Sequence, residues 1–154
     1  NINTAKQILD YAELNNVEIT LPLDFVCSRS LSGDKTWRIS TINDMKEDEF
    51  GYDIGPETTM DFQMHISKAK TIIWNGPLGV SEIPAFSTGT QAVAAAVIDQ
   101  TKMGALSLVG GGDTASALKS YGLVGGFSHI STGGGAFLHL LTDKILPAIK
   151  SINE

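Results

Sequence analysis

Three glycine-bearing turns contain the residues of this chain whose types and spacing could bind an anion. They are "WNGPLG" at 74–79, "GGGDT" at 110–114 and "STGGGA" at 131–136, and each follows a strand-like apolar segment. Glycine lets a backbone approach a ligand closely, and the unpaired amides at the start of a helix attract negative charge. Because the second and third turns lead directly into helix-like segments, the pattern predicts a site for a phosphate chain.

Asp113 follows Gly110, Gly111 and Gly112 directly. An acid at the start of a helix stabilises it by about 0.5–2 kcal/mol, which is a sufficient structural explanation. A carboxylate beside a bound phosphate would be repelled, however, unless a hard cation lay between them. Mg²⁺ suits such a mixture of carboxylate and phosphate oxygens. The hydroxyl of Thr114 could donate to a phosphate oxygen or only cap the helix.

The glycines could also serve only tight turns or close packing between a helix and a strand. In addition, two familiar phosphate-binding schemes fit these residues poorly. "GGGDTA" at 110–115 matches the dinucleotide pattern G-x-G-x-x-G/A, but that scheme needs an acid about 20 residues further on. No acid occurs between Asp113 and Asp143. A P-loop needs a glycine followed by lysine, which this sequence lacks.

The apolar periodicity indicates strands at 71–75, 105–110 and 127–132, with helical patterns between them. Further helices are predicted at 3–14 and at 56–69. This alternation predicts an α/β fold, a doubly wound parallel sheet of about four strands with helices on both faces. In such a sheet the strand-to-helix turns share one edge, so the glycine turns should converge.

The first third of the chain is less regular. "LPLDFVCS" at 21–28 and "TWRIS" at 36–40 are strand-like, and the sequence from there to Phe50 is acidic and typical of a loop. Cys27 is predicted to be a small buried residue rather than a nucleophile.

The composition limits the possible partners and location. The 154 residues include 42% hydrophobic residues, and 11 Lys and Arg against 17 Asp and Glu give a net charge of −6. The basic residues are scattered, which argues against nucleic acid or an acidic membrane as partner. The single cysteine fits a reducing compartment, and the longest nonpolar run, at 92–98, is far shorter than the ~20 residues of a membrane span. We therefore expect a cytoplasmic protein.

Four motifs taken together resemble the carboxyl-terminal part of phosphoglycerate kinases. They are "DIGPET" at 53–58, "IIWNGPLGVSE" at 72–82, "VGGGDTASAL" at 109–118 and "HISTGGGAFLHLL" at 129–141. Their order and spacing agree with that family, and the similarity extends to "KILPAIK" at 144–150. The resemblance implies reversible phosphoryl transfer between 1,3-bisphosphoglycerate and ADP, giving 3-phosphoglycerate and ATP in glycolysis, with Mg²⁺ bound to the nucleotide.

The family has two domains, one for the phosphoglycerate and one for the Mg-nucleotide, and the intact enzyme is expected to be a monomer. By resemblance, residues 1–154 are the carboxyl-terminal part of the nucleotide-binding domain. The phosphoglycerate-binding domain, its catalytic arginine and the phosphate-binding lysines are expected to be absent. The charge pattern agrees. None of the three turns contains a Lys or Arg, and the nearest basic residue downstream of Asp113 is Lys119, whereas phosphoryl transfer requires cations. The isolated chain should therefore be inactive.

The motifs also imply roles for single residues. Gly51 and Tyr52 would border the adenine, Asn75 and Pro77 would line the nucleotide cleft, and Glu82 would hold the ribose hydroxyls. Gly111, Gly112, Asp113 and Thr114 would contact the phosphates, with Asp113 as the metal ligand. The catalytic amides of Gly133 and Gly134 would stabilise the phosphoryl group during transfer.

One position departs from the family, and two other functions remain open. Ser81 stands where the family usually has an aromatic residue before the ribose glutamate, which leaves the contacts of Glu82 open.

The first alternative function is a stand-alone, non-catalytic module that binds a nucleotide or a partner. A dehydrogenase ranks below it, because the acid expected to hold a ribose is missing.

Overall fold

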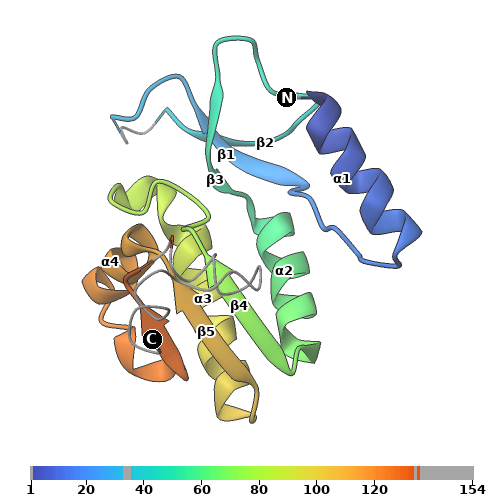
Figure 1. Ribbon diagram of the computed structural model, residues 1–154. Helices are drawn as coiled ribbons and strands as arrows, with labels where there is room; N and C mark the ends of the chain where they lie inside the picture. The colour runs from blue at the N-terminus through green and yellow to red at the C-terminus, as the bar shows by residue number, and fades with distance from the viewer. Residues whose placement is uncertain (1, 33–35, 134, 136–154) are drawn as a thin grey trace.

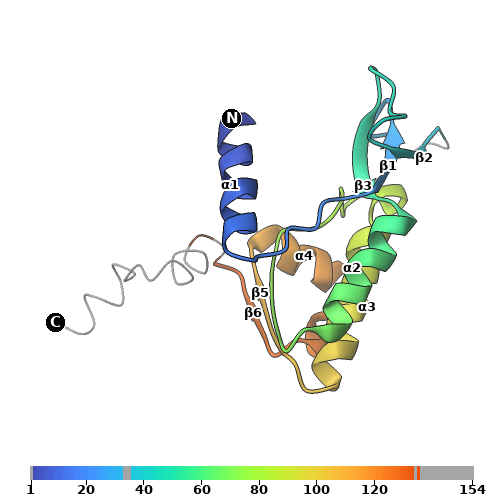
Figure 2. The same ribbon diagram turned by 90° about the vertical axis from the view of Figure 1, so that its right-hand side faces the viewer.

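The chain builds two three-stranded sheets, one antiparallel and one parallel, in a computed structural model that describes residues 2–32, 36–133 and 135 (Figure 1). The first helix is α1 (Ile2–Leu14). The antiparallel sheet consists of β1 (Asp24–Ser28), β2 (Arg38–Thr41) and β3 (Phe50–Ile54), in the order β2-β1-β3. Figure 2 shows α1 standing apart, and only Ala12 in this helix is buried.

The parallel sheet follows, with its helices between its strands. Its elements are α2 (Pro56–Lys68), β4 (Thr71–Asn75), α3 (Thr88–Lys102), β5 (Leu106–Gly110), α4 (Gly112–Ser120) and β6 (His129–Ser131). Two short 3₁₀ turns, η1 (Pro84–Phe86) and η2 (Val124–Gly126), lie before α3 and before β6. The strand order is β4-β5-β6, and both pairs are parallel. The predicted α/β class and parallel sheet are confirmed.

The helices α2, α3 and α4 lie together on one side of the parallel sheet (Figure 2). Alternate strand residues such as Trp74 and Val109 point to this side and form the core with Val97 and Leu118. The opposite face is open in the described part of the chain, where Ile73 is 47% exposed and Leu106 is 48% exposed. None of the described helices is long and apolar enough to span a bilayer.

The predicted number of about four parallel strands is corrected here for the described residues, whereas the prediction of helices on both faces also concerns residues after 135, which lie outside the described part. The described parallel strands number three, because β1, β2 and β3 pair antiparallel in a sheet of their own. The connections at 29–37 and 42–49 are shorter than the dozen or more residues that a parallel crossover needs. In the order β4-β5-β6 both right-handed crossovers run in the same direction, so they put α3 and α4 on the same face.

Asp24 connects the antiparallel sheet to α2. Its buried carboxylate, at the start of β1, accepts hydrogen bonds from the amides of Thr58 (2.8 Å) and Glu57 (3.1 Å), and from the Thr58 hydroxyl (2.7 Å). Burial raises the pKa of the Asp24 carboxyl, but these hydrogen bonds outweigh it and lower the pKa below its usual value. The carboxylate thus neutralises the positive end of α2.

Asp53 connects β3 to α3 in the same way. Its buried carboxylate accepts hydrogen bonds from the amides of Gly89 (2.8 Å) and Ile54 (2.9 Å). Burial raises the pKa of Asp53, and the amide hydrogen bonds oppose that rise. A Cβ at residue 89 would overlap both this carboxylate and the Ile54 side chain, so α3 can approach β3 only with glycine there.

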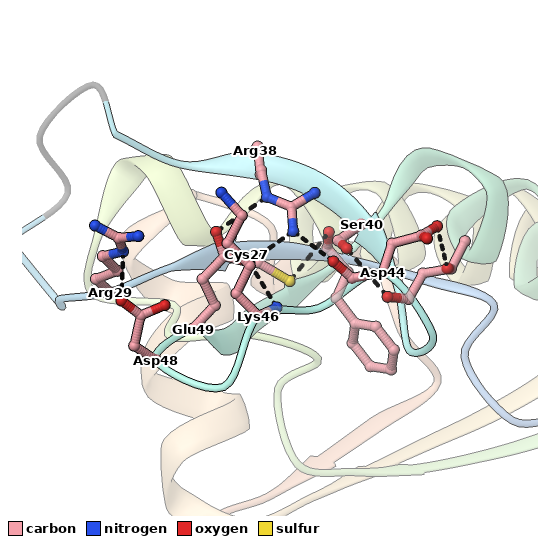
Figure 3. Close-up of polar contacts among 10 residues, drawn as sticks. Cys27, Arg29, Arg38, Ser40, Asp44, Lys46, Asp48 and Glu49 are labelled. Carbon is pink, nitrogen blue, oxygen red and sulfur yellow. Dashed lines mark hydrogen bonds and ion pairs between the residues drawn. The ribbon is translucent and has the colours of Figure 1, made fainter.

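The loop between β2 and β3 is held by an ion pair between Arg38 and Glu49 (Figure 3). Arg38 donates through Nε (3.0 Å) and Nη2 (2.7 Å) to the two oxygens of Glu49, and Nη2 also donates to the carbonyl of Asp44 (2.7 Å). The Lys46 amide donates to Glu49 as well, at 3.1 Å. The hydrogen bond from Arg38 is the main reason that the pKa of Glu49 falls to about 2. Cys27 is buried nearby, as predicted.

Replacing Glu49 by glutamine should make the protein less stable at pH 6, because the charged partner of Arg38 is lost. The carboxylate pKa falls from 4.5 to about 2 on folding, so its contribution is fully present above pH 4.5 and is lost as the pH falls toward 2. Urea unfolding of both proteins between pH 7 and pH 3 should show the difference in unfolding free energy narrowing below pH 4.5. The matched control Glu47→Gln, an exposed acid of the same loop, should show no such narrowing. A gap for Glu49→Gln that stays constant with pH would contradict the assignment.

Candidate functional site

The three glycine turns meet at the carboxyl edge of the parallel sheet, as predicted. Asn75 pairs with Gly110, and Gly110 pairs with Ser131, so the three strand ends are neighbours at the ladder spacing of about 4.8 Å. The carbonyl of Thr132 lies 3.9 Å from the position of a Cβ on Gly112, which brings the second and third turns within van der Waals reach. We refer to residues 74–79, 110–114 and 131–133 as the glycine rim. The predicted catalytic residue Gly134 lies outside the described residues.

The first turn of the glycine rim uses its amides inside the fold. The Gly76 amide donates to the hydroxyl of Thr114 (2.9 Å), and the Gly76 carbonyl accepts from Nε1 of Trp74 (2.6 Å). The Leu78 amide donates to the hydroxyl of Thr90 (3.0 Å). Pro77 has no amide proton. This turn therefore contributes shape to the rim, and the amides of Gly76 and Leu78 are already occupied.

Thr114 belongs to the framework of the rim. Its side chain is completely buried, and its hydroxyl accepts the Gly76 amide from a residue 38 positions away. Sequence analysis left two roles open for this hydroxyl, a phosphate ligand or a helix cap. In the structure it joins the first turn to the second, a role that required the three-dimensional pairing of β4 with β5.

The second turn presents the start of α4 without a side-chain cap. Gly111 occupies the N-cap position with φ +100°, a conformation that favours glycine, and no side chain caps the helix there. A Cβ at residue 111 would lie 3.1 Å from Oδ1 of Asn75, so the amide side chain of Asn75 borders this turn. Gly112 and Asp113 are exposed in the first turn of α4. The first amides of α4 are therefore open to an anion.

Asp113 projects from this helix end into solvent. Within the described part of the chain, no hydrogen bond or ion pair reaches its carboxylate. The same residues contain no group of three or more His, Cys, Asp or Glu that could hold a metal ion alone. A cation at Asp113 would consequently need oxygens from a ligand, which is the way proteins commonly hold Mg²⁺ with phosphates.

A hollow of about 530 Å³ lies beside α4 and contains Glu82. Its walls include Ser81, Ser87, Gln91 and Tyr121, with Ser116 and Ala117 of α4. A second hollow, of about 710 Å³, is lined by Gly112, Lys119, Phe127 and Thr132 together with Ser116. Because Ser116 lines both, the two hollows flank α4, one beside Glu82 and one beside the phosphate-binding turn predicted from sequence.

The remaining predicted residues lie around these hollows rather than in them. Gly51 and Tyr52 are in β3, where the Tyr52 ring packs against Phe86 with ring centroids 5.0 Å apart. The Tyr52 carbonyl accepts the amide of Val80 at 2.9 Å, just before Glu82. Asn75 and Pro77 line a separate hollow of about 440 Å³. The amide of Gly133 donates to the hydroxyl of Ser131 at 3.3 Å.

Sequence reasoning missed three residues that shape this region. Asp53 lies inside the quoted motif "DIGPET" but received no role, and Thr90 and Tyr121 were not considered. Asp53 holds α3, Thr90 holds the first turn of the glycine rim, and the Tyr121 hydroxyl donates to the carbonyl of Ser81 at 2.8 Å. An acid in an apolar strand segment is a signal that could have identified Asp53. The two others depend on contacts across 12 and 40 residues, for which the sequence carries no local signal.

Comparisons with known proteins agree with these features. The family model "Phosphoglycerate kinase" matches residues 1–144. Phosphoglycerate kinases of Prosthecochloris aestuarii and Thermosipho africanus are 45% and 47% identical to this chain over 153 and 152 residues. These matches cover 99% and 98% of this chain, but only 38% of each relative.

Solved structures agree as well. Phosphoglycerate kinase from Coxiella burnetii superposes with a TM-score of 0.90 at 44% identity, over 96% of this chain and 37% of that one. The enzyme from Pyrococcus horikoshii gives a TM-score of 0.75 at 30% identity, over 97% of this chain and 38% of the other. The chain therefore belongs to the phosphoglycerate kinase family, and it spans somewhat over a third of the length of the relatives it matches.

Replacing Thr114 by valine should loosen the glycine rim, because the partly buried Gly76 amide loses its acceptor while the side-chain volume hardly changes. The expected cost is about 1–3 kcal/mol of unfolding free energy, measured by urea unfolding, with faster hydrogen exchange at the Gly76 amide. Thr114→Ser keeps the hydroxyl and should retain slow exchange at Gly76. Equal exchange in the two variants would show that this hydrogen bond does not hold the turn.

Proposed function

We propose that this chain supplies the Mg-nucleotide half of a phosphoglycerate kinase, which transfers phosphate between 1,3-bisphosphoglycerate and ADP. The observation that carries the proposal is the open start of α4, with Gly111, Gly112 and the exposed carboxylate of Asp113 where three strand ends meet. Membership of the family over residues 1–144 supports it.

The contrast between the helices supports an external anion at α4. Buried Asp24 and Asp53 accept hydrogen bonds from amides at the starts of α2 and α3, whereas no side chain among the described residues accepts one from the first amides of α4. We propose that the amides of Gly112, Asp113 and Thr114 hold the phosphates. Asp113 would hold Mg²⁺ together with phosphate oxygens, and that ion supplies charge neutralisation when bound.

The other assignments follow the same geometry. Glu82 is exposed in the hollow beside α4, where it would accept hydrogen bonds from the ribose hydroxyls. Gly51 and Tyr52 would border the adenine near the loop that carries Glu82, and Asn75 and Pro77 would line the cleft at the first turn. Amides of the third turn, those of Gly133 and Gly134, would face the transferred phosphoryl group.

The charges of the rim indicate that the site is incomplete. No Lys or Arg occurs at 74–79, 110–114 or 131–136, whereas phosphoryl transfer requires cations around the developing charge. We propose that a phosphoglycerate-binding domain with these cations lies outside this chain, in line with the 38% of each relative that it matches. The isolated chain would bind nucleotide without turnover, and the intact enzyme would be a cytoplasmic monomer.

The absence of Lys and Arg from the three turns also favours a second candidate, a non-catalytic module that binds a nucleotide. The two candidates share the same phosphate site. They differ in whether these 154 residues support turnover when they are joined to the remaining part of a kinase, and an experiment can therefore separate them.

Replacing Asp113 by asparagine should remove most of the Mg²⁺ dependence of ADP binding. Calorimetric titration of the wild-type chain should show tighter binding of ADP with Mg²⁺ than without it. In Asp113→Asn we expect a loss of about tenfold with Mg²⁺, or about 1.4 kcal/mol, and little change without it. The control Asp99→Asn, an exposed aspartate in the last turn of α3, should behave like the wild type. An unchanged Mg²⁺ effect in Asp113→Asn would refute this role.

A chimera separates the kinase from the module. In the phosphoglycerate kinase of Thermosipho africanus, the 152 matched residues are replaced by this chain, and turnover is followed in a coupled assay. We expect turnover from the chimera, a strong loss when Asp113→Asn is added to it, and none from the isolated chain. A folded chimera that binds ADP without turnover would favour the module. Turnover by the isolated chain near that of an intact kinase would overturn the half-site proposal.

A further inference from the structure

Tyr121 connects the helix that carries Asp113 to the turn that carries Glu82. It occupies the C-cap position of α4, and its hydroxyl donates to the carbonyl oxygen of Ser81 at 2.8 Å, across 40 residues of sequence. Asp113 lies in the first turn of the same helix. One rigid element of about 13 Å, nine residues at 1.5 Å each, therefore links the two ends of the proposed nucleotide site.

The bond from Tyr121 acts on the peptide unit that joins Ser81 to Glu82. The amide of Ile83 closes a turn onto the carbonyl of Val80 at 3.0 Å, with Ser81 and Glu82 at its two central positions. The Ser81 carbonyl belongs to the same planar unit as the Glu82 amide. Fixing this carbonyl fixes the orientation of that plane, and with it the direction in which the Glu82 side chain leaves the backbone.

The surroundings keep Tyr121 as a donor. Burial raises the pKa of the Tyr121 hydroxyl above its usual value, and the nearby charges of Asp53 and Glu82 add to the rise, whereas hydrogen bonds with Ser87 and Ser81 oppose it. A tyrosine is already protonated at neutral pH at its usual pKa, so the hydroxyl has a proton to donate. Ser81 is itself buried, whereas Glu82 is exposed in the same hollow that Tyr121 lines.

We propose that Tyr121 is a positioning residue that directs Glu82 toward the ribose hydroxyls of the bound nucleotide. The inference rests on the proposed function, because it requires a nucleotide in the hollow beside α4. It assigns to Tyr121 an indirect effect on one part of the ligand, the sugar, and none on the phosphates.

The test compares two ligands in the wild-type chain and in Tyr121→Phe, which keeps the ring and removes only the hydroxyl. Calorimetric titrations with Mg²⁺ use ADP and 2′,3′-dideoxy-ADP, which lacks the ribose hydroxyls. We expect Tyr121→Phe to weaken ADP by about two- to tenfold and to leave dideoxy-ADP unchanged. The control Tyr11→Phe, on the exposed surface of α1, should change neither affinity.

A double-mutant cycle with Glu82→Ala, which removes the acceptor oxygens, provides the second readout. If Tyr121 acts through Glu82, adding Tyr121→Phe to Glu82→Ala should cause no further loss of ADP affinity. Equal weakening of both ligands by Tyr121→Phe, or an additive loss in the double variant, would overturn the inference, because either result indicates general packing. ADP binding that is unaffected by Tyr121→Phe would also overturn it, with the proposed function intact. A wild-type chain that does not bind ADP would instead refute the proposed function, and this inference with it.

Discussion

The arrangement of the two sheets depends on a pair of buried carboxylates that neutralise helix starts. Asp24 at the start of β1 binds the first amides of α2, and Asp53 in β3 binds the first turn of α3. A buried carboxylate is costly unless hydrogen bonds and partial positive charge compensate for the lost water. Here the helix amides supply both. Each strand of the antiparallel sheet that carries such an acid is thereby fixed to one helix of the parallel layer.

The position of the glycine rim follows from these anchors through a short series of hydrogen bonds. Asp53 holds the amide of Gly89, and the next residue, Thr90, accepts the amide of Leu78 in the first turn of the rim. Thr114 accepts the amide of Gly76 in the same turn. Two buried threonines, from the starts of α3 and α4, therefore hold the turn after β4. The first turn of the rim is therefore held by hydrogen bonds of the framework itself.

Much of the parallel half of the fold could be predicted from sequence, because its signals are local. Strands at 71–75 and 105–110 and the helix at 56–69 agree with β4, β5 and α2 within a residue or so. The convergence of the turns followed from the rule that parallel strands share a carboxyl edge. The antiparallel sheet could not be predicted in this way. β3 follows an acidic loop, and its partner β1 lies more than twenty residues earlier, so the pairing depends on burial and on the Asp24 and Asp53 anchors.

The threonines show a related limit at the site itself. From sequence, Thr114 beside Asp113 and the glycines could equally be a ligand of phosphate, because its type and spacing fit both roles. Its complete burial and its acceptance of the Gly76 amide show that the hydroxyl oxygen serves the framework, while Asp113 is the exposed side chain of that turn with oxygen to offer. The distinction is between adjacent residues on a helix, whose side chains point about 100° apart. Only the direction in which α4 packs on β5 decides which of the two faces the core and which faces the open helix start.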